Sequence, residues 1–149
     1  MKKIIFIGVL LFVISIHGQS KVTRNLGDYT ILKVYNGIEV ELIKSTENKL
    51  EITGEKSEIV KVKTVNNTLK LSLPFSLKPS DNAAEGEVFI QLFYKDTLTL
   101  IDANQGATIT AKDFQQDEVE ISAQERAYIN LVLKSKNIIV KAISGGIVK

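Results

Sequence analysis

The chain has 149 residues, with 19 basic and 17 acidic residues, one histidine and neither cysteine nor tryptophan. The histidine, His17, lies in a segment that we expect to be removed, which excludes zinc, copper and haem sites built on histidine or cysteine, and Ser-His or Cys-His nucleophiles. The absence of cysteine also excludes a disulfide framework and a lipid-modified N-terminal cysteine.

Residues 1–20 have the pattern of a secretory signal peptide. Lys2 and Lys3 precede an apolar run from Ile4 to Ile16, and the small residues Gly18 and Ser20 come before Lys21. The alternatives are cleavage after Gly18 and an uncleaved anchor helix. We therefore expect export to the periplasm, the cell surface or the medium.

The exported chain, residues 21–149, is expected to be formally neutral. The 19 basic residues less the two lysines of the signal peptide leave 17, against 17 acidic residues. No basic patch is visible in the sequence, so nucleic acid is not expected as a partner.

Residues 21–149 are predicted to form a single all-β domain, because Val, Ile and Thr are plentiful and no sustained helical period appears. Its N-terminal part, 29–94, reads as hairpin-rich. Asn36-Gly37 lies between two alternating runs and predicts a β-hairpin, since both residues tolerate positive φ. Asn66-Asn67 predicts a second hairpin in the same way.

Residues 97–149 contain a repeat of about 20 residues. The triplet Leu98-Thr99-Leu100 recurs as Val119-Glu120-Ile121 and again as Val140-Lys141-Ala142. We expect the outer residues of each triplet to face inward and Thr99, Glu120 and Lys141 to form one outward column. Such a repeat predicts a parallel β-helix, or solenoid, with turns of about 20 residues. An antiparallel sandwich with evenly spaced hairpins is the alternative.

Several short motifs in residues 29–149 resemble the head GIN domain family of auto-transporter adhesins. They are the segments Tyr35–Val40, Leu50–Gly54, Asn67–Leu71 and Ile143–Val148. The resemblance implies a right-handed β-helical fold at the cell surface or in the envelope. It implies no established activity and supplies no catalytic residues. Members of the family continue through further Ser-Gly corners, so we expect this chain to be a C-terminally short member.

The carboxylates do not predict a catalytic or metal site. Strand alternation places Glu39 with Glu41, and Glu118 with Glu120, on solvated faces. Asp102, Asp113 and Asp117 fall near corners of the repeat. No acidic ladder is expected, because Ala123 and Ser144 replace Asp102 in the next two copies. We therefore expect no catalytic residue, no metal and no cofactor.

Four residues are candidate contacts for a ligand: Tyr128, Phe75, Asp81 and Asn82. Tyr128 takes the outward position that Thr108 fills one copy earlier. The others belong to the longest irregular stretch, 74–86, and binding residues concentrate on such loops. Tyr29 and Tyr35 are further aromatics that could stack on sugars or peptides.

The function that the sequence favours is a non-enzymatic, exported β-solenoid that binds a surface glycan or protein. The alternatives are a carbohydrate-active β-helix enzyme that works through carboxylates, and a purely structural envelope component. Three or more carboxylates converging in one groove would favour the enzyme, and a flat polar face with exposed aromatics would favour binding. Self-association through an uncapped C-terminal edge, at Val140, Ala142 and Ile147, is also expected.

Overall fold

The computed structural model describes residues 21–76 and 82–149. The predicted signal peptide and Asp81 lie outside the described residues. The described ranges include the short 3-10 helix η1 (Ser57–Ile59), and they contain no helix that is long and apolar enough to cross a membrane. The strands are β1 (Val22–Asn25), β2 (Ile31–Val34), β3 (Glu39–Lys44), β4 (Lys49–Thr53), β5 (Lys61–Val65), β6 (Thr68–Ser72), β7 (Phe89–Tyr94), β8 (Leu100–Ala103), β9 (Thr108–Gln115), β10 (Glu118–Ala123), β11 (Tyr128–Lys134), β12 (Asn137–Ala142) and β13 (Ile147–Val148).

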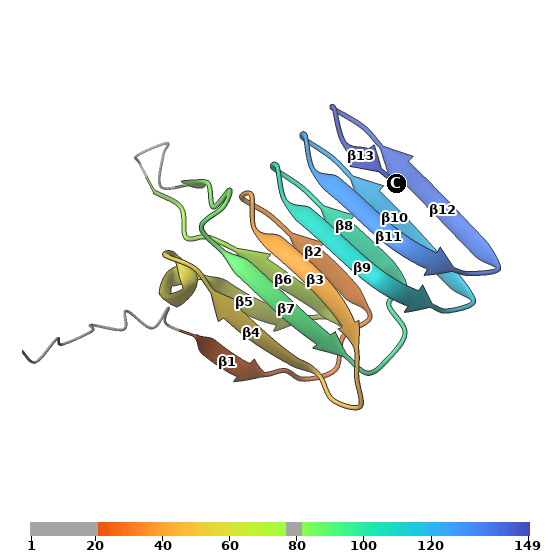
Figure 1. Ribbon diagram of the computed structural model, residues 1–149, viewed down its shortest axis with the longest axis horizontal. Coiled ribbons are helices and arrows are strands. Elements are labelled where there is room, and N and C mark those ends of the chain that lie inside the picture. The colour runs from red at the N-terminus through yellow and green to blue at the C-terminus, as the bar shows by residue number, and fades with distance from the viewer. Residues whose placement is uncertain (1–20, 77–81) are drawn as a thin grey trace, which may run out of the picture.

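The strands form two sheets that lie face to face (Figure 1). The seven-stranded sheet has the order β1-β4-β7-β3-β9-β11-β13, and the six-stranded sheet has the order β12-β10-β8-β2-β6-β5. One cluster of buried aliphatic and aromatic side chains fills the space between them. The prediction of an all-β fold is confirmed.

Five pairs of consecutive strands place their first strand in the six-stranded sheet and their second strand in the seven-stranded sheet. They are β2–β3, β6–β7, β8–β9, β10–β11 and β12–β13. Strands of neighbouring pairs lie parallel, with β2–β3 between β6–β7 and β8–β9. In the C-terminal part, Ile101, Ile121 and Val140 lie opposite one another on β8, β10 and β12. The parallel pairing predicted for the C-terminal repeat is confirmed. The structure thus establishes an all-β fold of two mixed sheets that contain parallel strands.

The hairpin predicted at Asn36-Gly37 is wrong. Both residues have positive φ, 61° and 70°, as the turn chemistry requires. The strands that they join, β2 and β3, nevertheless lie in different sheets, so the turn is a corner that crosses the core. Asn66-Asn67 joins β5 and β6, which pair antiparallel, and this hairpin is confirmed.

The predicted register of the repeat is one residue out between the first and second copies, and two residues out between the second and third, where Val140 pairs with Ile121 rather than Val119. Leu98, Val119 and Ile121 are buried as expected, but Leu100 pairs with Glu120 and is only half-buried on the outer face. Ile101 takes the inward position instead. The predicted column of Thr99, Glu120 and Lys141 is therefore wrong, although all three side chains do face outward. Glu120 lies between Leu100 and Ile139.

The last strands expose apolar residues. Val140 and Ala142 face inward, as predicted, but they continue the columns of Ile121 and Ala123 rather than those of Val119 and Ile121, and Val140 is 53% exposed. Ile147 pairs with Tyr128 and so lies on the outer face rather than in the inward column. Self-association through these residues stays a prediction.

Four corner turns stack along one end of the molecule, and we call them the corner column. They are Asn36-Gly37, Gln105-Gly106, Glu125-Arg126 and Ser144-Gly145, and every residue in them has positive φ. Each turn donates a backbone hydrogen bond to the next, from Gly37 to Gln105 (2.9 Å), from Gly106 to Glu125 (3.0 Å) and from Arg126 to Ser144 (3.2 Å). These bonds satisfy polar groups of the corners that the sheets leave unpaired.

Candidate functional site

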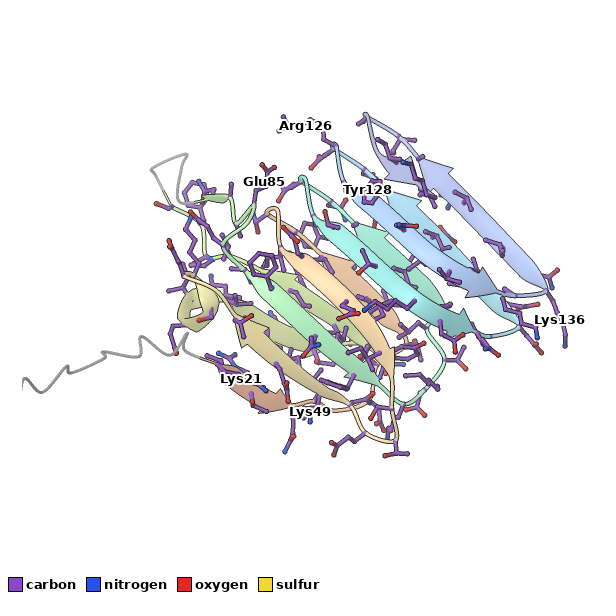
Figure 2. All side chains as sticks on the ribbon, in the orientation of Figure 1. Lys21, Lys49, Glu85, Arg126, Tyr128 and Lys136 are labelled. Atoms are coloured by element: carbon purple, nitrogen blue, oxygen red, sulfur yellow. The ribbon has the colours of Figure 1, made fainter. Side chains whose placement is uncertain are left out.

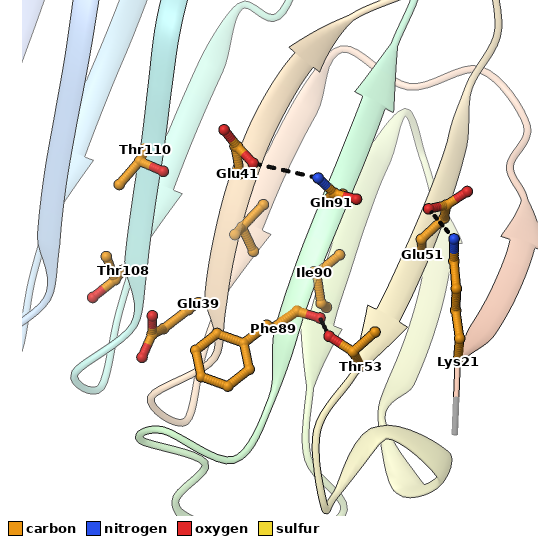
Figure 3. A pocket seen from close by; sticks show the side chains of 11 residues that line it. Lys21, Glu39, Glu41, Glu51, Thr53, Phe89, Ile90, Gln91, Thr108 and Thr110 are labelled. Atoms are coloured by element: carbon orange, nitrogen blue, oxygen red, sulfur yellow. Dashed lines mark hydrogen bonds and ion pairs between the residues drawn. The ribbon is translucent and has the colours of Figure 1, made fainter. Parts of the chain in front are cut away.

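The outer face of the seven-stranded sheet carries a shallow hollow of about 380 Å³ (Figure 3). Strands β4, β7, β3 and β9 supply its floor, so its side chains are held by the middle of a sheet rather than by loops. The lining combines carboxylates, hydroxyls and one aromatic ring: Glu39, Glu41, Glu51, Thr53, Thr108, Thr110 and Phe89.

Strand pairing places two aromatic side chains in one row across this face. From β7 to β11 the row consists of Phe89, Glu39, Thr108 and Tyr128, each opposite the next. Neighbouring strands lie roughly 4.8 Å apart, so three spacings separate the two aromatic positions by about 14 Å. Phe89 is 42% exposed and Tyr128 is half-buried. Figure 3 shows the ring of Phe89 beside the carboxylate of Glu39.

The next row holds the two ion-paired carboxylates of the hollow. It runs through Glu51, Gln91, Glu41 and Thr110. The Nζ of Lys21 lies 2.6 Å from Glu51, and the Nζ of Lys112 lies 3.0 Å from Glu41. The side-chain amide of Gln91 donates to Glu41 at 3.5 Å. The face is therefore polar, but much of its negative charge is neutralised.

These partners keep both carboxylates in their ionised form. The hydrogen bond from Lys112, and then that from Gln91, lowers the pKa of Glu41. The hydrogen bond from Lys21 lowers the pKa of Glu51 in the same way. A glycosidase needs one carboxyl group with a raised pKa to act as the acid. Three glutamates line the hollow, which meets the criterion of three converging carboxylates that would favour an enzyme. The lowered pKa values of Glu41 and Glu51, however, make these two carboxyl groups poor proton donors.

The described residues offer no cluster of three or more His, Cys, Asp or Glu side chains that could hold a metal ion. On the other sheet, Asp102 lies opposite Ser122 rather than Ala123, and Lys141 follows. The residues beside Asp102 are therefore Ser122 and Lys141, not the Ala123 and Ser144 that the repeat predicted. Asp102 is 4% exposed, and its carboxylate lies 3.5 Å from the Nζ of Lys33. The burial and the ion pair indicate a structural role for Asp102.

The remaining acidic candidates are spread over the surface. Asp117 pairs with Lys136 at 3.0 Å, and Asp113 accepts a hydrogen bond from Gln115 at 2.8 Å. Glu118 accepts from Asn137, and Glu120 pairs with Lys141 at 2.6 Å. Each therefore has a local partner on the surface.

Of the candidate contact residues that the structure describes, Tyr128 lies on β11, and Phe75 and Asn82 lie in the loop after β6. Tyr128 occupies the slot of Thr108, as expected, and the Nζ of Lys149 lies 5.6 Å from its ring centroid. Figure 2 shows Tyr128 on the face that the seven-stranded sheet turns to the viewer. Phe75 is 83% exposed, in the loop after β6.

The side chain of Asn82 is engaged within its own loop. Its oxygen accepts from the backbone N–H of Ser76, and its amide donates to the Ser76 carbonyl, both at 2.7 Å. Asn36 of the corner column bonds to the same loop. Its side-chain NH2 donates to the Asn82 carbonyl at 3.0 Å, and its side-chain oxygen accepts from the backbone N–H of Leu73 at 3.0 Å. Asn82 therefore shapes the loop, and its side-chain amide and oxygen are already bonded.

The sequence also suggested Tyr29 and Tyr35 as contact residues. Tyr29 is 2% exposed and belongs to the core, which corrects its candidacy as a contact residue. Tyr35 is half-buried, with the Nζ of Lys70 4.5 Å from its ring centroid. Phe89 was missed. The alternation of Phe89, Gln91 and Phe93 along β7 was the signal for it, because it places the three on the outer face.

The fold and this face define an all-β protein that presents a shallow polar hollow on the outer face of a sheet. The chain belongs to the family described as "Putative auto-transporter adhesin, head GIN domain", whose model matches residues 28–149. This confirms the family suggested by the sequence motifs. No curated protein is significantly similar to the chain.

Solved structures share the fold at low sequence identity. A "putative adhesin" from Bacteroides fragilis is 16% identical, with a TM-score of 0.69 over 88% of this chain and 61% of its own. A "putative adhesin" from Parabacteroides merdae is 15% identical, with a TM-score of 0.61 over 85% and 59%. A "putative lipid binding protein" from Parabacteroides distasonis is 14% identical, with a TM-score of 0.54 over 83% and 60%. The chain thus spans about three fifths of each of these proteins, and the similarity shows the fold alone.

Proposed function

We propose that this chain is an exported, non-enzymatic adhesion module that binds carbohydrate on the outer face of its seven-stranded sheet. Membership of an adhesin family, together with the fold shared with proteins named adhesins, supports a role at the cell surface. The signal-peptide pattern of residues 1–20 supports export.

The observation that carries the proposal is the row from Phe89 to Tyr128. Two aromatic side chains flank a carboxylate and a hydroxyl on one rigid surface, at about 14 Å. Sugar rings offer apolar C–H faces that stack on aromatic rings, and hydroxyls that bond to carboxylate and threonine oxygens. An oligosaccharide lying across the strands would meet all four side chains.

The charge of the face favours binding over cleavage. Glu41 and Glu51 are held ionised by Lys112 and Lys21, so they can accept hydrogen bonds from sugar hydroxyls but are poor proton donors. The hollow is shallow, so a bound sugar would keep much of its contact with water.

We further propose that the paired strands are turns of a β-solenoid. The offsets support this: Leu100 to Glu120 is 20 residues, and Glu120 to Ile139 is 19. Stacking such turns would hold Thr108 and Tyr128 at a fixed spacing and give the binding face its rigidity.

A glycan array tests the function. Purified protein is applied to immobilised neutral and acidic oligosaccharides, and the array is then examined by mass spectrometry for shortened products. We expect binding to a subset of oligosaccharides without any cleavage. Cleavage that the variant Glu39→Gln abolishes would replace the proposal with the enzyme, and failure to bind any oligosaccharide would refute it.

A further inference from the structure

The six-stranded sheet carries a row of lysines on its outer face, away from the proposed carbohydrate site. Lys63 on β5 pairs with Lys70 on β6, and Lys70 pairs with Lys33 on β2. Three cations are thus in register on three neighbouring strands. We call these three residues the lysine row.

Most of the charge in the lysine row is not neutralised by the protein. Asp102, the next residue along, pairs with Lys33 at 3.5 Å and ends the row. Lys70 lies over the ring of Tyr35, and Lys63 forms no ion pair with any described residue. Like charges directly opposite one another destabilise a sheet. Such an arrangement costs stability unless an external anion compensates it.

The positive charge ends along one side of the lysine row and continues along the other, toward Lys61 and Arg24. On one side the outward residues are Val65, Thr68 and Ile31, which carry no charge. On the other side Lys61 and Ser72 are paired. Arg24 and Lys61 border a hollow of about 620 Å³ that also reaches Lys63 and Lys70. Two strand spacings make the row roughly 10 Å long.

We propose that the lysine row binds a linear acidic polysaccharide laid across β5, β6 and β2. A linear chain with carboxylate or sulfate groups spaced along it places an anion on each lysine in turn. The charge pattern disfavours a flat anionic membrane, because Asp102, Glu118 and Glu120 lie further along the same sheet and would face it. This second site does not depend on the carbohydrate site, since the two lie on opposite sheets.

The test compares two variants that each remove two positive charges. Lys63→Gln with Lys70→Gln breaks the row, and Lys134→Gln with Lys136→Gln is the matched control at the far end of the molecule (Figure 2 labels Lys136). Binding to polygalacturonate, heparin, dextran and vesicles of phosphatidylglycerol with phosphatidylcholine is measured at low and high salt. We expect wild type to bind the two acidic polysaccharides and to release them at high salt. The row variant should bind at least tenfold more weakly, and the control should stay within twofold of wild type.

Stability is measured in parallel. The row variant should unfold at the same or a higher urea concentration than wild type, because like-charge repulsion is relieved. If the double variant does not fold, Lys63→Gln on the edge strand β5 serves the same comparison. Equal loss in the row and control variants, binding that survives the row variant, binding to vesicles alone, or no binding to either polysaccharide would each overturn the proposal.

Discussion

Arg126 adopts the same left-handed backbone conformation as Gly106, one turn earlier in the corner column. Their φ angles are 64° and 73°, and both donate a backbone hydrogen bond to the next corner. Glycine takes this conformation without steric cost, whereas a residue with a Cβ pays roughly 1–2 kcal/mol. Arg126 therefore occupies the second position of its corner turn, where the other three turns of the corner column have glycine.

We predict that Arg126→Gly raises the free energy of unfolding by about 1 kcal/mol, because it removes this strain. Urea unfolding followed by circular dichroism measures the change. Arg126→Ala is the control, since it removes the guanidinium but keeps the Cβ, and it should give no gain. A glycine variant that is less stable than wild type would mean that the arginine side chain stabilises the corner.

The amide of Asn36 should stabilise the long loop after β6. It bonds to Leu73, to the Asn82 carbonyl and to Gln105, so we expect Asn36→Gly to lower the free energy of unfolding by about 1–3 kcal/mol. Asn36→Ala should cost about 1 kcal/mol more, because alanine is also strained at φ 61°. Equal stability of the two variants would show that backbone strain plays no part.

The positive φ values at Asn36-Gly37 were predictable from the residue types. Whether the turn forms a hairpin or a corner between the two sheets was not. The φ values are the same for a hairpin and for a corner between sheets. Which of the two forms depends on the strands that lie beside β2 and β3, namely β6, β8, β7 and β9, and these come from distant segments. Local sequence does not contain that information.

The one-residue register error has a similar origin. Leu98-Thr99-Leu100 alternates like a strand, but Leu98 and Ile101 both face the core, since β8 begins only at Leu100. The lysine row was invisible for the same reason, because Lys33, Lys63 and Lys70 come together only through strand pairing. The family and the all-β class were predictable, since motifs and composition are local properties.

Acid should weaken the fold partly through Glu41. Lys112 and Gln91 lower the pKa of this carboxyl group in the folded state. A lowered pKa stabilises the fold above the unfolded value of about 4.3, and this stabilisation is lost as the pH falls through the folded value. We predict that stability falls less steeply below about pH 5 in Glu41→Gln than in wild type. Identical pH profiles from urea titrations would contradict this.

Asp102 should matter for stability rather than for catalysis. It is buried and accepts from Gln124 at 3.3 Å besides pairing with Lys33, so Asp102→Asn should cost about 1–2 kcal/mol. Asp117→Asn is the control, because its exposed ion pair with Lys136 should contribute about 0.5 kcal/mol or less. Thermal unfolding distinguishes them, and similar losses in both variants would contradict a special role for Asp102.

The central claim is that Phe89 and Tyr128 form one carbohydrate-binding row. Isothermal titration with the tightest-binding oligosaccharide from the array tests it in wild type, Phe89→Ala, Tyr128→Ala and Phe75→Ala. Phe75 is the matched control, since it is more exposed than either aromatic but lies in a loop. We predict that each row variant weakens binding about tenfold or more, while Phe75→Ala stays within about twofold of wild type. Unchanged affinity in both row variants, or a loss confined to Phe75→Ala, would contradict the account.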